Sequence, residues 1–249
     1  MNAVIWHDVE CGAYAEDLPL WRSLAAEHGD PVLDVGAGTG RVALDLARAG
    51  YRVTALDRDP DLIAALESRL GRNVRMDAVS SQAPVTTAVA DARDFDLGDE
   101  RFPLIIVPMQ TIQLLGGREG RGAFLRCARR HLRPGGVLAA AIAEVLDTYE
   151  VVDGLPAPLP DLREEDGVVY SSQPIAVRAD PRGFVLERRR ETVSRAGERT
   201  VERDLIHLDL LTVEDLEREG AAAGLTPAQR EHVRETSDYS GSEVVILRG

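Results

Sequence analysis

The sequence contains no lysine, because all 29 basic residues are arginine. Schiff-base chemistry on a lysine side chain is therefore excluded. The chain has two cysteines, Cys11 and Cys127, and two thiols so far apart make neither a disulfide framework nor a zinc site. Aromatic residues are scarce at 4%, so we expect a core built from leucine, valine, isoleucine and alanine.

Long apolar runs are missing as well. The longest, residues 137–143, is far too short to cross a bilayer, and residues 1–14 lack the apolar segment of a signal peptide. The net charge of −13 disfavours nucleic acid as a partner. The basic cluster Arg188–Arg190 lies between Glu187 and Glu191, which indicates an exposed strand of alternating charge. We therefore expect a cytoplasmic protein that binds neither nucleic acid nor a membrane.

Strands and helices alternate along the first part of the chain. The expected strands and helices, in chain order, are 17–28 (helix), 31–35 (strand), 41–49 (helix), 52–56 (strand), 59–70 (helix), 85–90 and 104–107 (strands), 122–132 (helix) and 137–142 (strand). Alternation of this kind is typical of right-handed βαβ units and a doubly wound parallel sheet. A length of 249 residues fits one such domain, or a domain with an insertion.

The alternation breaks at a proline-rich segment, residues 155–160. Three strands joined by hairpin turns are expected next, at 168–177, 184–194 and 200–210. A helix from 212 to 223 and strands at 229–235 and 243–247 then complete the pattern. The predicted fold is α/β, with a seven-stranded, mostly parallel, doubly wound sheet formed by residues 1–150 and 211–249. Residues 151–210 form an antiparallel β insertion.

A glycine-rich turn, Val-Leu-Asp-Val-Gly-Ala-Gly-Thr-Gly at residues 32–40, follows the first strand and opens a helix. Glycines allow a tight turn and close approach of a ligand, and amides at a helix start can bind it. Asp34 lies at the strand end, beside the crevice where open α/β sheets bind ligands. The rival dinucleotide fingerprint is G-x-G-x-x-G/A. Counted from Gly36 the fingerprint fails, because Arg41 stands at its third glycine position. Counted from Gly38 it passes, because Ala43 stands at that position. The glycines alone therefore leave both families open.

Five motifs in order and at suitable spacing resemble the class I S-adenosylmethionine-dependent methyltransferases. They are Asp34 with the glycine turn, Asp57 after the second strand, Asp91 after the third, the segment 108–113 after the fourth and the turn 132–136 before the fifth. The resemblance covers about residues 30–145 together with the final helix and strands. It implies that the turn wraps the methionine part of the donor, that Asp57 binds the ribose and that Asp91 binds the adenine. The residues it assigns to S-adenosylmethionine are Asp34, Gly36, Ala37, Gly38, Gly40, Asp57, Arg58, Asp91, Ala92, Arg93, Pro108 and Met109.

The segment Tyr14–Trp21 is similar to the N-terminal helix of small-molecule methyltransferases such as glycine N-methyltransferase and the deoxysugar amine N-methyltransferases. In those enzymes a tyrosine approaches the donor and an antiparallel insertion covers the acceptor. The resemblance therefore implies Tyr14 at the site. Gln110 and Gln113 follow the fourth expected strand at the crevice, so we expect them to orient the acceptor.

The implied reaction is direct in-line methyl transfer to nitrogen or oxygen of a small-molecule acceptor, without a metal and with S-adenosylhomocysteine as product. Alignment supplies much of the acceleration, so a base is optional; the candidates are Tyr14, Glu144, Tyr170, His207 and Tyr239. Two alternatives stay open: a non-catalytic S-adenosylmethionine-binding module and an NAD-dependent oxidoreductase. A homodimer is compatible with the sequence.

Overall fold

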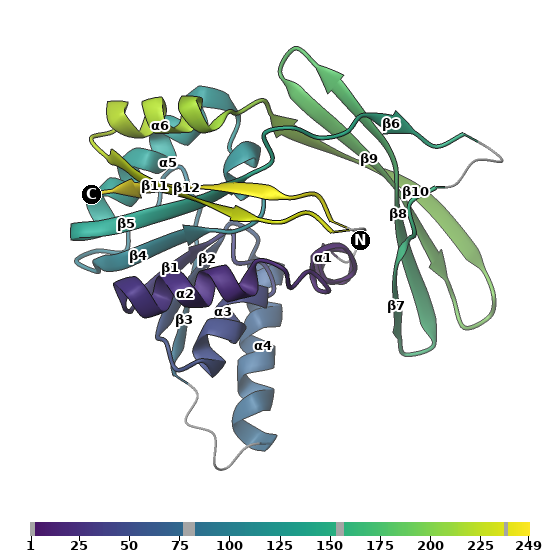
Figure 1. Cartoon of the computed structure of the whole chain (residues 1–249). Coiled ribbons are helices and arrows are strands. Elements are labelled where there is room, and N and C mark those ends of the chain that lie inside the picture. The colour runs from purple at the N-terminus through teal and green to yellow at the C-terminus, as the bar shows by residue number, and fades with distance from the viewer. Residues whose placement is uncertain (1–2, 77–82, 153–156, 237–238) are drawn as a thin grey trace.

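The structure is a computed structural model that describes residues 3–76, 83–152, 157–236 and 239–249. Its centre is a seven-stranded sheet in the order β11-β12-β5-β4-β1-β2-β3 (Figure 1). Strands β3, β2, β1, β4 and β5 pair in parallel, and β12 is antiparallel to both of its neighbours. The strands are β1 (Val32–Val35), β2 (Val53–Asp57), β3 (Val85–Val89), β4 (Phe102–Val107), β5 (Leu132–Ile142), β11 (Thr226–Val233) and β12 (Ser242–Arg248). The predicted doubly wound, mostly parallel sheet is confirmed.

Helices cover both faces of this sheet (Figure 1). Helices α2 (Leu18–His28), α3 (Arg41–Arg48) and α4 (Pro60–Met76) pack on one face, and α5 (Gly117–His131) and α6 (Val213–Ala222) on the other. A short 3₁₀ helix, η1 (Thr111–Leu114), follows β4. Each face has its own apolar cluster, with Trp21 and Leu66 in one and Phe102 and Phe124 in the other.

Capping residues fix where two of these helices start. Thr212 accepts a hydrogen bond from the Asp215 amide at 3.1 Å, which is the N-cap geometry expected before α6. Asp59 accepts one from the Asp61 amide at 2.9 Å, and Pro60 begins α4. These local bonds satisfy amides that lack partners inside the helix.

A second, antiparallel sheet stands beside the first (Figure 1). Its order is β10-β9-β8-β6, and β7 pairs with β8. The strands are β6 (Tyr149–Glu150), β7 (Asp161–Glu165), β8 (Val168–Asp180), β9 (Gly183–Val193) and β10 (Arg199–Asp209). The three hairpin strands predicted here are present as β8, β9 and β10. Strands β6 and β7, which bring this sheet to five strands, were not predicted. Both are short, and they lie on either side of the proline-rich segment.

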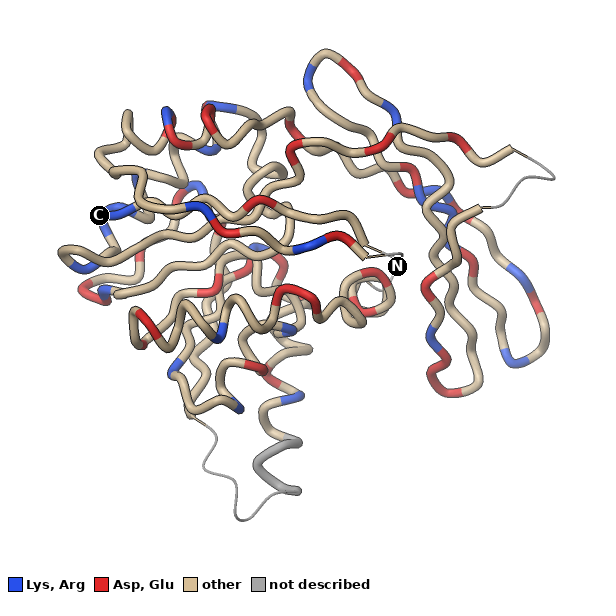
Figure 2. The backbone as a smooth tube through the Cα atoms, in the orientation of Figure 1, with Lys and Arg blue, Asp and Glu red and all other residues tan. Residues whose placement is uncertain are grey.

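Acidic and basic residues lie close together along the strands of the second sheet (Figure 2). The interpretation of Arg188–Arg190 as an exposed, alternating strand is wrong for Arg188, which is only 8% exposed. Arg188 donates hydrogen bonds to Ser172 Oγ and to the carboxylate of Asp161. Because successive side chains of a strand point to opposite faces, Arg189 points outward, whereas Arg188 and Arg190 point toward the protein interior.

An N-terminal helix, α1 (Ala3–Cys11), lies between the two sheets (Figure 1). It was not predicted, since its nine residues carry both apolar and charged side chains in a mixed pattern. Ile5, Trp6 and Val9 are buried, and the Trp6 ring meets Tyr170 of β8 edge to face at 5.7 Å. In the described ranges, no helix is long and apolar enough to cross a membrane.

Candidate active site

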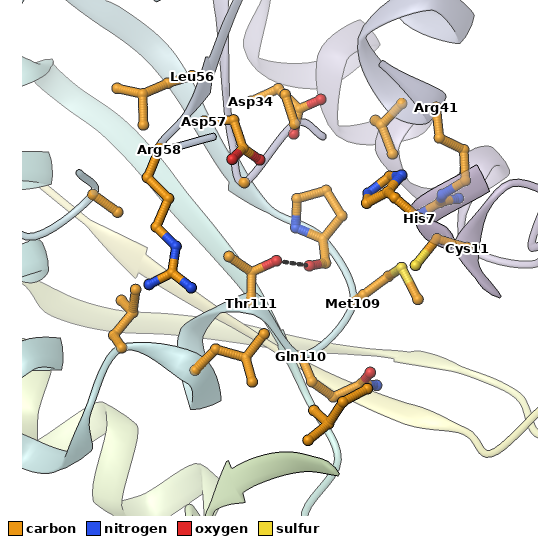
Figure 3. A pocket seen from close by; sticks show the side chains of 18 of the residues that line it. His7, Cys11, Asp34, Arg41, Leu56, Asp57, Arg58, Met109, Gln110 and Thr111 are labelled. Carbon is orange, nitrogen blue, oxygen red and sulfur yellow. Dashed lines mark hydrogen bonds between the residues drawn. The ribbon is translucent and has the colours of Figure 1, made fainter. Parts of the chain in front are cut away.

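A cavity of about 340 Å³ opens at the carboxyl ends of β1, β2 and β4. That volume is within the usual range for small-molecule sites. Figure 3 shows side chains from several elements directed into it. The wall on the side of the parallel sheet contains Asp34, Gly36, Ala37, Arg41, Val42, Leu56, Asp57, Arg58, Ala90, Asp91, Ala92, Arg93, Pro108, Met109, Gln110, Thr111, Leu114 and Leu115. Helix α1 contributes His7, Glu10 and Cys11, and the second sheet contributes Leu186, Arg188, Ile206 and Leu208.

Asp34 is the most unusual group in this wall. Its side chain is 1% exposed, and neither carboxylate oxygen has a hydrogen-bond partner among the described residues. Burial, together with the charges of Asp17 and Asp57 and against that of Arg41, raises the pKa of Asp34 to about 7. A buried carboxylate without a partner is costly, so the site is built for a ligand group that donates hydrogen bonds and carries positive charge.

The glycine turn shapes the cavity wall, but three of its amides are already hydrogen-bonded within the protein. The amides of Gly36 and Ala37 both donate to the Leu56 carbonyl, at 2.8 and 3.0 Å, and the Gly38 amide donates to Asp57 Oδ2 at 2.8 Å. These three amides are therefore already paired within the protein. Gly36 lines the cavity at φ 74°, and a Cβ there would meet Thr111 Cγ2 at 2.4 Å. Gly38 and Gly40 lie outside the cavity lining, where they let His7 and Leu66 pack closely.

Two further carboxylates, Asp57 and Asp91, line the cavity and accept different sets of hydrogen bonds. Asp57 accepts hydrogen bonds from the amides of Gly38 and Asp59, which fixes its orientation and leaves lone pairs free on both oxygens. Asp91 accepts three bonds from Arg93, and these, with the charges of Arg93 and Arg58, lower its pKa to about 2. Asp91 is therefore ionised at any physiological pH, and its carboxylate is shared with a neighbouring guanidinium.

The segment after β4 lies at the edge of the cavity (Figure 3). Met109 has a φ of 55°, a sparsely populated conformation for a residue with a side chain, and such residues cluster at binding sites. Thr111 Oγ1 donates to the Pro108 carbonyl at 3.0 Å and closes the turn. Gln110 faces the cavity, and its amide is 3.4 Å from Ser242 Oγ.

Gln113 and Tyr14 lie outside the cavity lining. Gln113 is buried and fully paired: its amide nitrogen donates to the carbonyls of Ala143 and Asp209, and its oxygen accepts from the Ala143 amide. Tyr14 packs against Tyr239, with ring centroids 4.9 Å apart, and the Arg41 guanidinium lies 5.0 Å from its ring. Both residues support neighbours of the cavity: Gln113 holds the end of β5, and Tyr14 packs behind Arg41.

The residues that sequence reasoning missed come from α1 and from the second sheet. Glu10 accepts hydrogen bonds from Ser172 and Arg190, and Asp8 accepts them from Thr39 and Arg163. Helix α1 is thus bound to the glycine turn on one side and to the second sheet on the other. No pattern within residues 3–11 reveals this, because the partners of these side chains are more than 30 positions away.

The cavity fits the parts of S-adenosylmethionine that a protein must recognise. Asp34 can hold the ammonium group, and the Arg41 guanidinium, which lines the cavity beside it, can face the carboxylate. Asp57 can accept two ribose hydroxyl groups, and Asp91 can accept the adenine amine. Leu56, Ala92 and Leu115 offer apolar surface for the adenine ring.

Comparison with known proteins agrees with this geometry. Residues 32–136 match the family model of a methyltransferase domain. The cypemycin N-terminal methyltransferase of a Streptomyces species is 37% identical over 123 residues, which are 49% of this chain and 44% of that protein. The probable cobalt-precorrin-6B C(15)-methyltransferase (decarboxylating) of Methanothermobacter thermautotrophicus is 34% identical over 127 residues, 51% of this chain and 59% of that protein. The chain thus spans about half the length of these curated relatives.

Solved structures resemble the chain over nearly its whole length. The sugar N-methyltransferase KedS8 of Streptoalloteichus sp has a TM-score of 0.70 at 22% identity, covering 100% of this chain and 93% of that one. CalS10, an amino pentose methyltransferase of Micromonospora echinaspora, has a TM-score of 0.68 at 23% identity, covering 98% and 97%. The CcbJ methyltransferase of Streptomyces caelestis has a TM-score of 0.68 at 21% identity, covering 96% and 91%. At these identities the likeness is one of fold, and it includes the second sheet.

The predicted fold is confirmed by these structures, and residues 32–136 match a methyltransferase domain, as the resemblance implied. This segment contains the glycine turn, Asp57, Asp91 and the residues that follow β4, in the order that the resemblance required. Residues 32–136 therefore match a methyltransferase domain, and the chain has the fold of these solved methyltransferases.

Proposed function

We propose that the whole chain is an enzyme that transfers a methyl group from S-adenosylmethionine to an amine nitrogen of a small molecule. The observation that carries the donor part is the buried Asp34 carboxylate, which lines the cavity without a hydrogen-bond partner among the described residues. The cationic amino group of the donor supplies the missing partner. NAD presents hydroxyl and amide donors but no ammonium group, so it would leave this carboxylate without a positively charged partner.

The acceptor part of the proposal rests on the second sheet. Leu186, Ile206 and Leu208 of the second sheet add apolar side chains to the cavity lining, and Met109 and Gln110 line it from the segment after β4. A covered pocket of this size admits a small molecule or a flexible chain end and excludes a folded macromolecule. The site residues Asp34, Asp57, Asp91 and Gln110 act here as binding and orienting groups, and alignment of nitrogen and methyl carbon contributes to the rate.

Nitrogen is favoured over oxygen by the names of similar proteins. CalS10 and KedS8 are named as an amino pentose methyltransferase and a sugar N-methyltransferase, and the cypemycin enzyme as an N-terminal methyltransferase. These names belong to those proteins. For this chain they motivate amines as the first acceptors to test.

The experiment has two stages. Calorimetric titration of the purified protein with S-adenosylhomocysteine, beside NAD, should give micromolar binding of the first and none of the second. Formation of S-adenosylhomocysteine from S-adenosylmethionine is then followed with matched acceptors, glucosamine against glucose and benzylamine against benzyl alcohol. Turnover with an amine and not with its alcohol supports the proposal. Donor binding without turnover on any acceptor would indicate a non-catalytic module, and binding of NAD alone would refute the donor assignment.

A further inference from the structure

The second sheet and its neighbours give one side of the cavity an apolar surface. Leu186 of β9 and Ile206 of β10 lie directly opposite each other in the antiparallel ladder, and both line the cavity. Leu208 lies two positions further along β10 and therefore on the same face of the strand. Leu114 of η1 and Cys11 of α1 also line the cavity, and burial raises the pKa of the Cys11 thiol to about 11, so that the thiol stays uncharged. We call these five residues the apolar wall; none of them belongs to the groups that fit the donor.

The polar side chains that α1 brings to this part of the cavity are already engaged within the protein. Both oxygens of Glu10 accept hydrogen bonds from Arg190, at 2.7 and 2.9 Å, so a guanidinium neutralises its charge. Both ring nitrogens of His7 face the glycine turn, since Nδ1 is 3.3 Å from Thr39 Oγ1 and a Cβ placed on Gly38 would be 2.2 Å from Nε2. Within its described residues, helix α1 therefore offers an acceptor no unpaired carboxylate at the cavity.

Two other polar side chains border the same space, and each keeps one atom without a partner. Arg188 donates from Nε to Ser172 Oγ at 2.8 Å and from Nη2 to the Ser172 carbonyl and the Asp161 carboxylate. Gln110 lines the cavity, and its amide nitrogen is 3.4 Å from Ser242 Oγ (Figure 3). Among the described residues, Nη1 of Arg188 and Oε1 of Gln110 have no hydrogen-bond partner. This part of the cavity can therefore serve one or two polar groups of a ligand.

A sugar ring does not match these surroundings. Each of its hydroxyl groups brings a donor and an acceptor, and each hydroxyl that is buried without a partner weakens binding by about 5- to 150-fold. None of the described residues that line the cavity is Phe, Tyr or Trp, so it also lacks an aromatic face on which a sugar ring could lie. A hydrocarbon body, in contrast, gains free energy by covering the apolar wall.

We propose that the apolar wall holds the body of the acceptor and that this body is a hydrocarbon ring or chain. Oε1 of Gln110 can accept an N–H of the amine, and Nη1 of Arg188 can bind one further oxygen at most. Ile206, opposite Leu186 in the ladder, then acts as a specificity-determining residue. This inference rests on the proposed function and adds to it the chemistry of the part of the acceptor that is not methylated.

The first test compares two amines of similar ring size, cyclohexylamine and glucosamine. In the wild type, kcat/KM for cyclohexylamine should exceed that for glucosamine by about 100-fold or more, because several hydroxyl groups of the sugar find no partner. Cyclohexylamine is the more basic amine, so less of it is unprotonated at neutral pH, and this difference works against the expected order. A kcat/KM for glucosamine that equals or exceeds that for cyclohexylamine would overturn the inference.

The second test places the same new side chain on the two faces of β10. Ile206→Thr should lower kcat/KM for cyclohexylamine by about tenfold, because apolar contact is lost and a hydroxyl group is introduced. Leu205→Thr is the matched control: Leu205 is the adjacent residue, is 55% exposed and lies outside the cavity lining, so its replacement should leave kcat/KM unchanged. Both variants should keep the circular dichroism spectrum and the S-adenosylhomocysteine affinity of wild type. Equal effects of the two substitutions, or a loss of product affinity in a folded Ile206→Thr, would contradict the assignment.

The third test needs no methyl transfer. Saturation-transfer NMR of the S-adenosylhomocysteine complex is recorded with cyclohexanol and with inositol, which have the same ring and no amine. Cyclohexanol should bind to wild type and more weakly to Ile206→Thr, and inositol should not bind. Absent binding of cyclohexanol, or equal binding of inositol, would refute the apolar wall as a binding surface.

The two failures can be told apart. A wild type that binds cyclohexanol but methylates no amine would refute the proposed function and still support the apolar wall as a binding surface. A wild type that methylates glucosamine as well as cyclohexylamine would support the proposed function and overturn this inference.

Discussion

Replacing Asp34 by asparagine should make the ligand-free protein more stable and should weaken its binding of the donor. The wild-type carboxyl group has an unfolded-state pKa of 3.8 and a folded-state pKa of about 7. Between these values the unfolded chain has lost the proton and the folded protein still holds it. Stability is therefore lost as the pH rises from about 4 to 7, and the loss is complete above that window.

The size of the effect follows from the two pKa values. A difference of about 3 units corresponds to about 4 kcal/mol at pH 8, since each unit is about 1.4 kcal/mol. At pH 5 about 1.5 kcal/mol of this is already lost, because the unfolded carboxyl group is mostly ionised there. Asparagine does not titrate, so the advantage of Asp34→Asn should be about 2–3 kcal/mol larger at pH 8 than at pH 5. Any constant cost of burying the amide cancels in this comparison.

Urea denaturation of both proteins at pH 5 and pH 8 measures this difference. Asp99→Asn is the matched control, because Asp99 is exposed and its replacement should shift stability equally at both pH values. A constant difference between Asp34→Asn and wild type would show that Asp34 is solvated or paired, and the reasoning about the cavity would be refuted.

The same pKa predicts how donor binding depends on pH. Only the ionised carboxylate pairs with an ammonium group, and its fraction rises about tenfold from pH 6 to pH 8 when the pKa is about 7. Calorimetry of wild type should therefore show S-adenosylhomocysteine bound about tenfold more tightly at pH 8. Asp34→Asn should bind about 10- to 100-fold more weakly at pH 8 and lose the pH dependence, because a charge-assisted bond is worth about 1.5–3 kcal/mol.

Three other substitutions test the wall of the site. Asp57→Ala should weaken S-adenosylhomocysteine binding by at least about tenfold in calorimetry while the circular dichroism spectrum is unchanged, because ribose acceptors are lost; unchanged affinity would remove Asp57 from the site. Gly38→Ala should cost about 1–3 kcal/mol more in denaturation than Gly98→Ala, since both glycines have positive φ but only the first Cβ meets another residue, His7; equal costs would mean that the ring does not lie over the turn. Gln113→Ala should lose about 2–4 kcal/mol, because the Ala143 amide and two carbonyls lose their partner, with product affinity preserved; a stable variant that no longer binds would instead place Gln113 at the ligand.

The local patterns of the sequence predicted the parallel sheet and the carboxylates that we propose bind the donor. Alternation of short apolar strands with amphipathic helices defines βαβ units, and the right-handed connection then aligns all strand ends at one edge. Asp34, Asp57, Asp91 and Met109 lie at or just beyond the carboxyl ends of four different strands, so topology alone brings them to one cavity. Thr212 and Asp59 fixed helix starts through bonds to amides two or three residues away, which is why those starts were readable in the sequence.

Only the tertiary structure decided the features that depend on contacts between distant segments. Helix α1, strands β6 and β7, the inward position of Arg188 and the place of His7 depend on partners distant in sequence, which no local periodicity encodes. Gln110 and Gln113 are three residues apart in similar surroundings, yet the turn of η1 directs one to the cavity and buries the other against β5 and β10. Residue types and spacing thus determined which groups can bind the donor, whereas packing between distant segments determined which of them face it and in what protonation state.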